Sequence, residues 1–133
     1  MAGPAFIIGT GPGVGASTAP RFGRAGHSVG LVARDRGRVG RLDGRQLGPP
    51  EVACFSPHPD VTLIKLVLET TPQDLRAALD LSVADAAATA QAVLPGMREA
   101  DRGTLLFVTG SAVENPSADA HIRRIAHVDR FTG

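Results

Sequence analysis

The chain has 133 residues, of which 43% are hydrophobic and 20% charged, and its formal net charge at neutral pH is +1. This length suits one domain with a single hydrophobic core. The nearly balanced charge argues against a chain that binds nucleic acid through overall electrostatic attraction, so we expect no nucleic-acid partner. The single cysteine excludes an internal disulfide and fits a reducing compartment.

The N-terminal third predicts a strand, a turn, a helix and a second strand. The apolar run Ala5–Ile8 predicts a buried strand, because short apolar runs bounded by glycine are typical of parallel-sheet cores. A glycine-crowded turn follows, then a helix predicted over Val14–Ala25 and a second strand over Ser28–Ala33. This order is a βαβ unit, and its turn can hold a diphosphate.

Glycines in this turn allow positive φ angles and a close approach of the backbone to phosphate oxygens. The unpaired N–H groups at the start of the helix, together with its dipole, would supply the anion site. Two registers fit: G-x-x-x-G-x-G from Gly9, or G-x-G-x-x-A from Gly11. The kinase-type phosphate loop is excluded, because Ala16 stands where its lysine is required. The residues expected to contact the cofactor here are Gly9, Thr10, Gly11, Gly13, Val14 and Gly15.

Arg34 lies at the end of the second predicted strand, about 20 residues after the glycines, where a side chain that reads the ribose belongs. An arginine suits the 2′-phosphate of NADP, whereas an acidic side chain would accept a hydrogen bond from the 2′-hydroxyl of NAD. The neighbouring Asp35 keeps NAD open as the alternative. We therefore predict NADP as the cofactor. A solvated strand end is the competing interpretation of Arg34.

A second motif lies in residues 71–116, where Gln91–Pro95 and Met97 are followed by Gly103–Phe107. Together with the glycine turn, these residues resemble the short-chain dehydrogenase/reductase family. Residues 71–116 look like that family's long central helix, the strand after it, and the loop that carries its catalytic serine. The resemblance covers residues 5–35 and 52–116, and it implies a Rossmann-like, nucleotide-binding fold.

The resemblance also implies further site residues. The segment Cys54–Pro57 stands where the family has the Asn-Asn-Ala-Gly strand end that lines the cofactor cleft, so Ser56 is expected to contact the cofactor. Thr109 and Ser111 flank the family's catalytic serine position and could orient a substrate carbonyl. The family's reaction also uses Tyr-x-x-x-Lys, but the sequence contains no tyrosine, and its single lysine is Lys65. Catalysis by this chain alone is therefore not expected.

Compared with the family, the sequence looks internally shortened and C-terminally truncated. Only residues 35–51 lie between Arg34 and the third predicted strand, which begins at Val52, where the family has two helices and a strand. The sequence also stops after the position of the family's fifth strand. We interpret residues 1–116 as a shortened dinucleotide-binding domain and residues 117–133 as a poorly packed tail.

The expected architecture is an abbreviated doubly wound α/β fold with three layers, α/β/α. Two further strands are predicted at Val52–Phe55 and Thr104–Thr109, which gives about four parallel strands with the first strand between the second and the third. A long helix is predicted over Thr71–Arg98, with a bend near Ser82 and a helix-start signal in Thr71–Asp74. By family resemblance this helix is also a candidate homodimer surface.

The function implied by the resemblance is NAD(P)-dependent hydride transfer to or from a carbonyl or alcohol substrate. The alternatives are a non-catalytic nucleotide-binding or dimerisation module, or a degenerate fragment. No metal site is expected, because the four histidines lack the spacing of metal ligands. No signal segment or membrane-spanning apolar stretch is recognised, so we expect a soluble cytoplasmic protein without a membrane partner.

Overall fold

The computed structural model describes residues 2–9, 13–32, 47–57 and 67–108. The chain divides into two compact units, each of which is described by itself. The first combines Met1–His58 with Thr89–Val108, and the second combines Pro59–Ala88 with Thr109–Gly133. The predicted tail, residues 117–133, lies outside the described residues.

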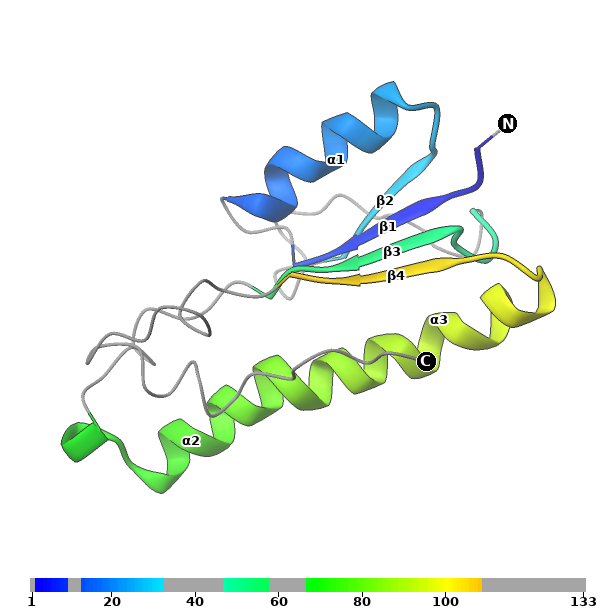
Figure 1. Ribbon diagram of the computed structural model, residues 1–133. Helices are drawn as coiled ribbons and strands as arrows, with labels where there is room; N and C mark the ends of the chain where they lie inside the picture. Colours follow the sequence, from blue (N-terminus) through cyan, green and yellow to red (C-terminus); the bar gives the residue numbers. More distant parts are fainter. Residues whose placement is uncertain (1, 10–12, 33–46, 58–66, 109–133) are drawn as a thin grey trace. The chain divides into compact units, whose positions relative to one another are not determined.

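The first unit contains one parallel sheet, shown in Figure 1, with the strand order β2-β1-β3-β4. The strands are β1 (Ala5–Ile8), β2 (Val29–Val32), β3 (Val52–Phe55) and β4 (Thr104–Phe107). This confirms the predicted strands and their order, except that β4 ends at Phe107, so Val108 lies outside it, whereas the strand was predicted over Thr104–Thr109. β2 starts one residue later than predicted. The residue before it, Ser28, uses its carbonyl oxygen to accept a hydrogen bond from Ala5 N at 2.8 Å.

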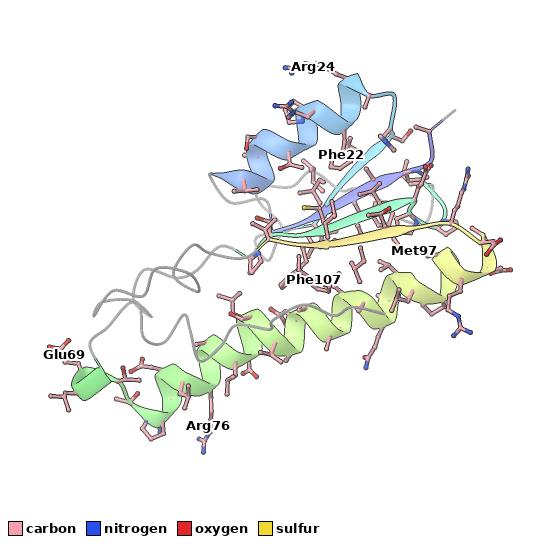
Figure 2. All side chains as sticks on the ribbon, viewed as in Figure 1. Phe22, Arg24, Glu69, Arg76, Met97 and Phe107 are labelled. Carbon is pink, nitrogen blue, oxygen red and sulfur yellow. The ribbon has the colours of Figure 1, made fainter. Side chains whose placement is uncertain are left out.

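Helices cover both faces of this sheet, so the predicted three-layer arrangement is confirmed. α1 (Val14–Arg24) lies on one face and α3 (Asp85–Glu99) on the other (Figure 1). Figure 2 shows Met97 and Phe107 on the α3 face. The core between α3 and the sheet contains Ala53, Val93 and Met97, with Ile8 and Leu105 packed against it.

Close packing between α3 and the start of β4 depends on Gly103. A Cβ atom added to Gly103 would lie 2.4 Å from Cγ of Met97, which is well inside van der Waals contact. Met97 itself is buried. The glycine in the predicted run Gly103–Phe107 therefore lets the strand begin directly against the helix.

The segment before β1 is held by residues that shortly precede the neighbouring strands β2 and β3. Gly3 N donates to Glu51 Oε2 at 2.5 Å, and the His27 Nδ1 atom lies 2.7 Å from the Gly3 carbonyl oxygen. The His27 ring also packs edge-on against Phe22, with ring centroids 5.4 Å apart. His27 therefore has a structural role at the edge of the sheet where the strands begin.

The described part of the second unit consists mainly of helix. α2 (Pro72–Leu79) leads into a π-helical segment, Asp80–Ala84, which continues into α3. The predicted helix start is confirmed as a capping box: Thr71 Oγ1 accepts from Asp74 N at 3.2 Å, and Thr71 N donates to Asp74 Oδ2 at 2.9 Å. Ser82, near which the bend was predicted, lies within the wider π-helical turn.

By length and composition alone, the helical stretch Pro72–Glu99 could cross a membrane. This qualifies the expectation that no apolar stretch is long enough to do so. It is weak evidence, because core helices of soluble proteins pass the same test. Within the first unit, Val93 and Met97 of this stretch are buried against Ala53 of the sheet.

Candidate functional site

The candidate site lies where the strands β1 and β3 end. β1 is paired with β2 on one side and with β3 on the other, so the winding of the chain reverses between β1 and β3. In open parallel sheets, ligands bind outside the carboxyl ends of the strands at this switch point. Gly9 follows β1, Ser56 follows β3, and α1 begins close by at Val14.

Gly9 makes the turn after β1 possible for steric reasons. Its φ is +93°, and a Cβ atom there would lie 2.0 Å from the carbonyl oxygen of Ser56. Its N–H donates to the carbonyl oxygen of Val32 at 2.8 Å, which continues the pairing of β1 with β2. The Gly9 N–H is therefore already hydrogen-bonded within the sheet. What Gly9 contributes to the candidate site is the absence of a side chain, which lets the ends of β1 and β3 lie close together.

The other two glycines of the G-x-x-x-G-x-G register have separate structural roles. Gly13 is the N-cap residue of α1, with φ +134°, and an added Cβ would meet no described atom within 4 Å. Gly15 is buried in the first turn of α1. Gly9, Gly13 and Gly15 thus occupy the strand end, the helix cap and the first helical turn, which favours this register. In the other register, the last position is Ala16, which is exposed on α1.

The start of α1 has the electrostatic features of an anion site. Among the described residues no side chain caps it, and its first turn contains no acidic residue. The first amide bonded within the helix is Ser17 N, which donates to Gly13 O at 3.0 Å. The amides of Val14, Gly15 and Ala16 precede it, and such amides have no partner within the helix. They lie at the positive end of the helix dipole, where an anion is stabilised.

Nearby hydroxyl groups do not compete for these amides. Ser17 Oγ donates to Gly13 O at 3.0 Å and to Val14 O at 3.1 Å, and Thr18 Oγ1 donates to Val14 O at 2.5 Å. These hydroxyls therefore bond to carbonyl oxygens of the first turn. The amides at the start of α1 remain oriented by the helix backbone.

Ser56 is the polar residue buried at the opposite side of this switch point, with 7% of its surface exposed. Its N–H donates to the carbonyl oxygen of Ile8 at 2.7 Å, and Pro57 after it has no N–H. The backbone of this strand end is thus fixed against β1. The structure brings Ser56 together with Gly9, as the sequence predicted for two cofactor-lining segments.

Cys54 is buried in the middle strand β3, and burial raises the pKa of its thiol. The thiol is therefore protonated at neutral pH, which agrees with a packing role rather than with a nucleophilic one.

The sequence did not reveal that Phe55 and Phe107 pair edge to face, with ring centroids 6.1 Å apart. Both residues end their strands and lie opposite each other in the register of β3 and β4. Aligning the two predicted strands at their ends would have indicated the pair.

Several predicted site residues lie outside the described residues and remain predictions. They are Thr10, Gly11, Arg34, Thr109 and Ser111. Among the residues that the structure describes, no group of three or more His, Cys, Asp or Glu side chains could hold a metal ion. The described part of the site consists of backbone amides, glycines and the Ser56 hydroxyl, which suits a phosphate-containing ligand.

Solved structures share this fold. The TT0495 protein of Thermus thermophilus matches with a TM-score of 0.81 and 22% identity, over 95% of this chain and 62% of that protein. An oxidoreductase of the short-chain dehydrogenase/reductase family from Burkholderia thailandensis matches with a TM-score of 0.77 and 21% identity, over 95% of this chain and 57% of that one. The chain has the fold of the short-chain dehydrogenases.

The short-chain dehydrogenase fold also appears in a 7α-hydroxysteroid dehydrogenase solved in complex with NADH and 7-oxo glycochenodeoxycholic acid. It matches with a TM-score of 0.67 and 18% identity, over 93% of this chain and 59% of that enzyme. The family resemblance indicated by the sequence is thus confirmed at the level of the fold. No protein-family model matches the sequence, and no curated protein matches it either. The chain spans about three fifths of the length of these structural neighbours.

Proposed function

We propose that this chain binds a nicotinamide dinucleotide across the carboxyl ends of β1 and β3, as an oxidoreductase-type domain of the short-chain dehydrogenase kind. The observation that carries the proposal is the uncapped start of α1, placed by Gly9, Gly13 and Gly15 at the switch point of the sheet. The amides there would hold the diphosphate. The structural neighbour that was solved with NADH supports a dinucleotide as the ligand.

NADP is the cofactor that we propose, with NAD as the weaker ligand. Arg34 follows β2 after a short interval, and a guanidinium group recognises the 2′-phosphate that distinguishes NADP. Thr10 and Gly11 would complete the diphosphate turn, together with Gly13, Val14 and Gly15. The proposed substrate class is a small carbonyl or alcohol compound, with Thr109 and Ser111 as the hydroxyls nearest to it.

The 133 residues are proposed to bind cofactor without completing hydride transfer. The sequence contains no tyrosine, and Lys65 is its single lysine, so the proton-transferring pair of the family is not encoded in these residues. This favours a second candidate function, a non-catalytic nucleotide-binding module. A homodimer through residues 71–98 and a soluble, cytoplasmic location complete the proposal.

The proposal is tested by titrating NADPH fluorescence with the wild-type chain and with Gly13→Val. A valine would force an L-residue into φ +134° and place its side chain in the open space before the amides of α1. We expect NADPH binding to weaken by more than about tenfold, because the diphosphate loses its approach to these amides. Titration of the wild type with NADH should give weaker binding than with NADPH.

Gly26→Ala is the matched control. Gly26 also has a positive φ, +90°, and an added Cβ there meets no described atom within 4 Å, but it lies beyond the other end of α1. The control also places an L-residue at a positive φ, but away from the amides at the start of α1, and it should bind NADPH like the wild type. Identical curves for Gly13→Val and the wild type would reject the diphosphate turn. Equal affinities for NADH and NADPH would reject the assignment of Arg34.

A further inference from the structure

The end of β3 presents an unusual set of hydrogen-bonding groups next to the proposed diphosphate turn. Ser56 N–H is bonded to Ile8 O at 2.7 Å, and Pro57 has no N–H. On the β1 side, Gly9 N–H is bonded to Val32 O at 2.8 Å. Among the described residues at these two strand ends, the hydroxyl of Ser56 is therefore the remaining donor.

This hydroxyl is buried without a hydrogen-bond partner among the residues that the structure describes. Ser56 is 7% exposed, and its carbonyl oxygen lies against Gly9, in the space where a side chain would otherwise stand. Buried hydroxyl groups in folded proteins nearly always have a partner, and each exception calls for an explanation. A ligand bound outside the carboxyl ends of β1 and β3 would supply one.

The strand order indicates which part of a dinucleotide reaches this position. β2, after which Arg34 follows, lies on one side of β1, and β3 lies on the other. If Arg34 reads the adenosine 2′-phosphate, the adenosine half lies toward β2, and the other half extends toward β3 and β4. A ribose hydroxyl can both donate and accept a hydrogen bond, so it matches a serine hydroxyl.

We propose that the Ser56 hydroxyl hydrogen-bonds the ribose of the nicotinamide half of a bound dinucleotide and so distinguishes a complete dinucleotide from an adenosine fragment. This inference rests on the proposed function. The inference goes beyond the proposed function in two ways. It assigns a side-chain contact at a position where the family that this sequence resembles has an alanine, and it names the half of the ligand that this contact recognises.

The experiment compares Ser56→Ala with the wild type in two titrations, one with NADPH and one with adenosine 2′,5′-bisphosphate, which lacks the nicotinamide half. We expect the variant to bind NADPH about fivefold more weakly, the effect of losing one hydrogen bond. Its affinity for the bisphosphate should stay unchanged. Ser28→Ala, which removes an exposed hydroxyl before β2, is the matched control and should change neither affinity.

Thermal unfolding without ligand provides an independent readout. If the hydroxyl has no partner in the free protein, Ser56→Ala should unfold at the same temperature as the wild type or slightly above it, since it removes a buried polar group. A clear fall in the unfolding temperature would overturn the proposal, because it would show an internal partner. The NADPH titration is then repeated with Ser56→Cys, whose side chain is similar in size to serine but is a much weaker hydrogen-bond donor, so that the packing is kept.

The two hypotheses fail in different ways. Equal NADPH affinity for Ser56→Ala and the wild type, or an equal loss for both ligands, would overturn the role of Ser56 and leave the dinucleotide site intact. A wild-type chain that binds neither ligand would overturn the proposed function and this inference together.

Discussion

At the scale of single residues, the absence of a side chain has a different consequence at each of three glycines. Gly9 makes room for a neighbouring carbonyl oxygen, and Gly26 allows the chain to turn after α1. An added Cβ on Gly13, before α1, would meet no described atom within 4 Å. All three have positive φ angles, which L-residues rarely adopt. Their substitution should therefore have different consequences, even though a sequence pattern treats them alike.

Gly9→Ala should be the most destabilising of these changes. Its Cβ would lie 2.0 Å from the Ser56 carbonyl oxygen at φ +93°, so the ends of β1 and β3 would have to separate. We expect a loss of about 2–4 kcal/mol in the free energy of unfolding, measured by urea denaturation. Gly26→Ala, with a similar φ and no described atom near its Cβ, should lose about 1 kcal/mol. Equal losses for both would contradict the steric role of Gly9.

At the scale of elements, α1 provides the amides of the candidate site, but it also contains a residue that weakens the helix. Pro20 lies within the helix and has no N–H to donate to the carbonyl oxygen of Ala16. Arg21 and Arg24 in the last turn partly compensate, since cations stabilise the negative end of the helix dipole. The first turn, which presents the amides, precedes the proline and keeps its geometry.

Pro20→Ala should therefore stabilise the protein without changing its ligand affinity. Pro20 is exposed, so no core packing is lost, and a backbone hydrogen bond is restored. The expected gain is about 1–3 kcal/mol in the free energy of unfolding, measured by urea denaturation. Ala16→Gly, in the same helix, should lower the free energy of unfolding by about 1 kcal/mol. This control tests whether α1 unfolds in the transition that is measured. A stabilised Pro20→Ala variant that no longer binds NADPH would mean that the proline shapes the site.

The elements themselves could be predicted from the sequence because their signals are local. Ala5–Ile8 and Val52–Phe55 are apolar runs bounded by turn residues, and Thr71, Pro72 and Asp74 together specify a helix start. The sequence predicted a bend near Ser82 but not the π-helical turn that the structure has there, because such turns are rare and no local signal in the sequence identified one.

The contacts within the site could not be predicted, because they join segments far apart in the sequence. That Gly9 N–H is bonded to Val32, and that Ser56 O occupies the space beside Gly9, follows from the register of three strands. The pairing of Phe55 with Phe107 has the same origin. The glycine motif drew attention to Gly9 and the family resemblance to Ser56, while the pairing of the strands determines which of their amides bond within the sheet.

At the scale of the whole molecule, the proposed cofactor binding needs only part of the fold. The described residues proposed to bind the cofactor, Gly13 to Gly15 and Ser56, all belong to the first compact unit. They need the sheet and α1 but no catalytic side chain. The neighbours with this fold are longer, and this chain covers only 57–62% of the three structures compared. Binding without turnover is thus physically consistent for these 133 residues.

We therefore expect the purified 133-residue chain to bind NADPH but not to oxidise it when carbonyl compounds are added. General acid catalysis needs a proton donor of suitable acidity within hydrogen-bond reach of the substrate oxygen, and aliphatic hydroxyl groups such as those of threonine and serine are too weakly acidic for that role. The measurement follows NADPH absorbance over a panel of aldehydes and ketones, with an intact short-chain dehydrogenase as the positive control. Turnover by the wild type that disappears in Gly13→Val would contradict this expectation, because it would show that the bound cofactor reacts. Turnover equal in both proteins would point instead to a contaminating enzyme, so the variant separates the two sources of activity.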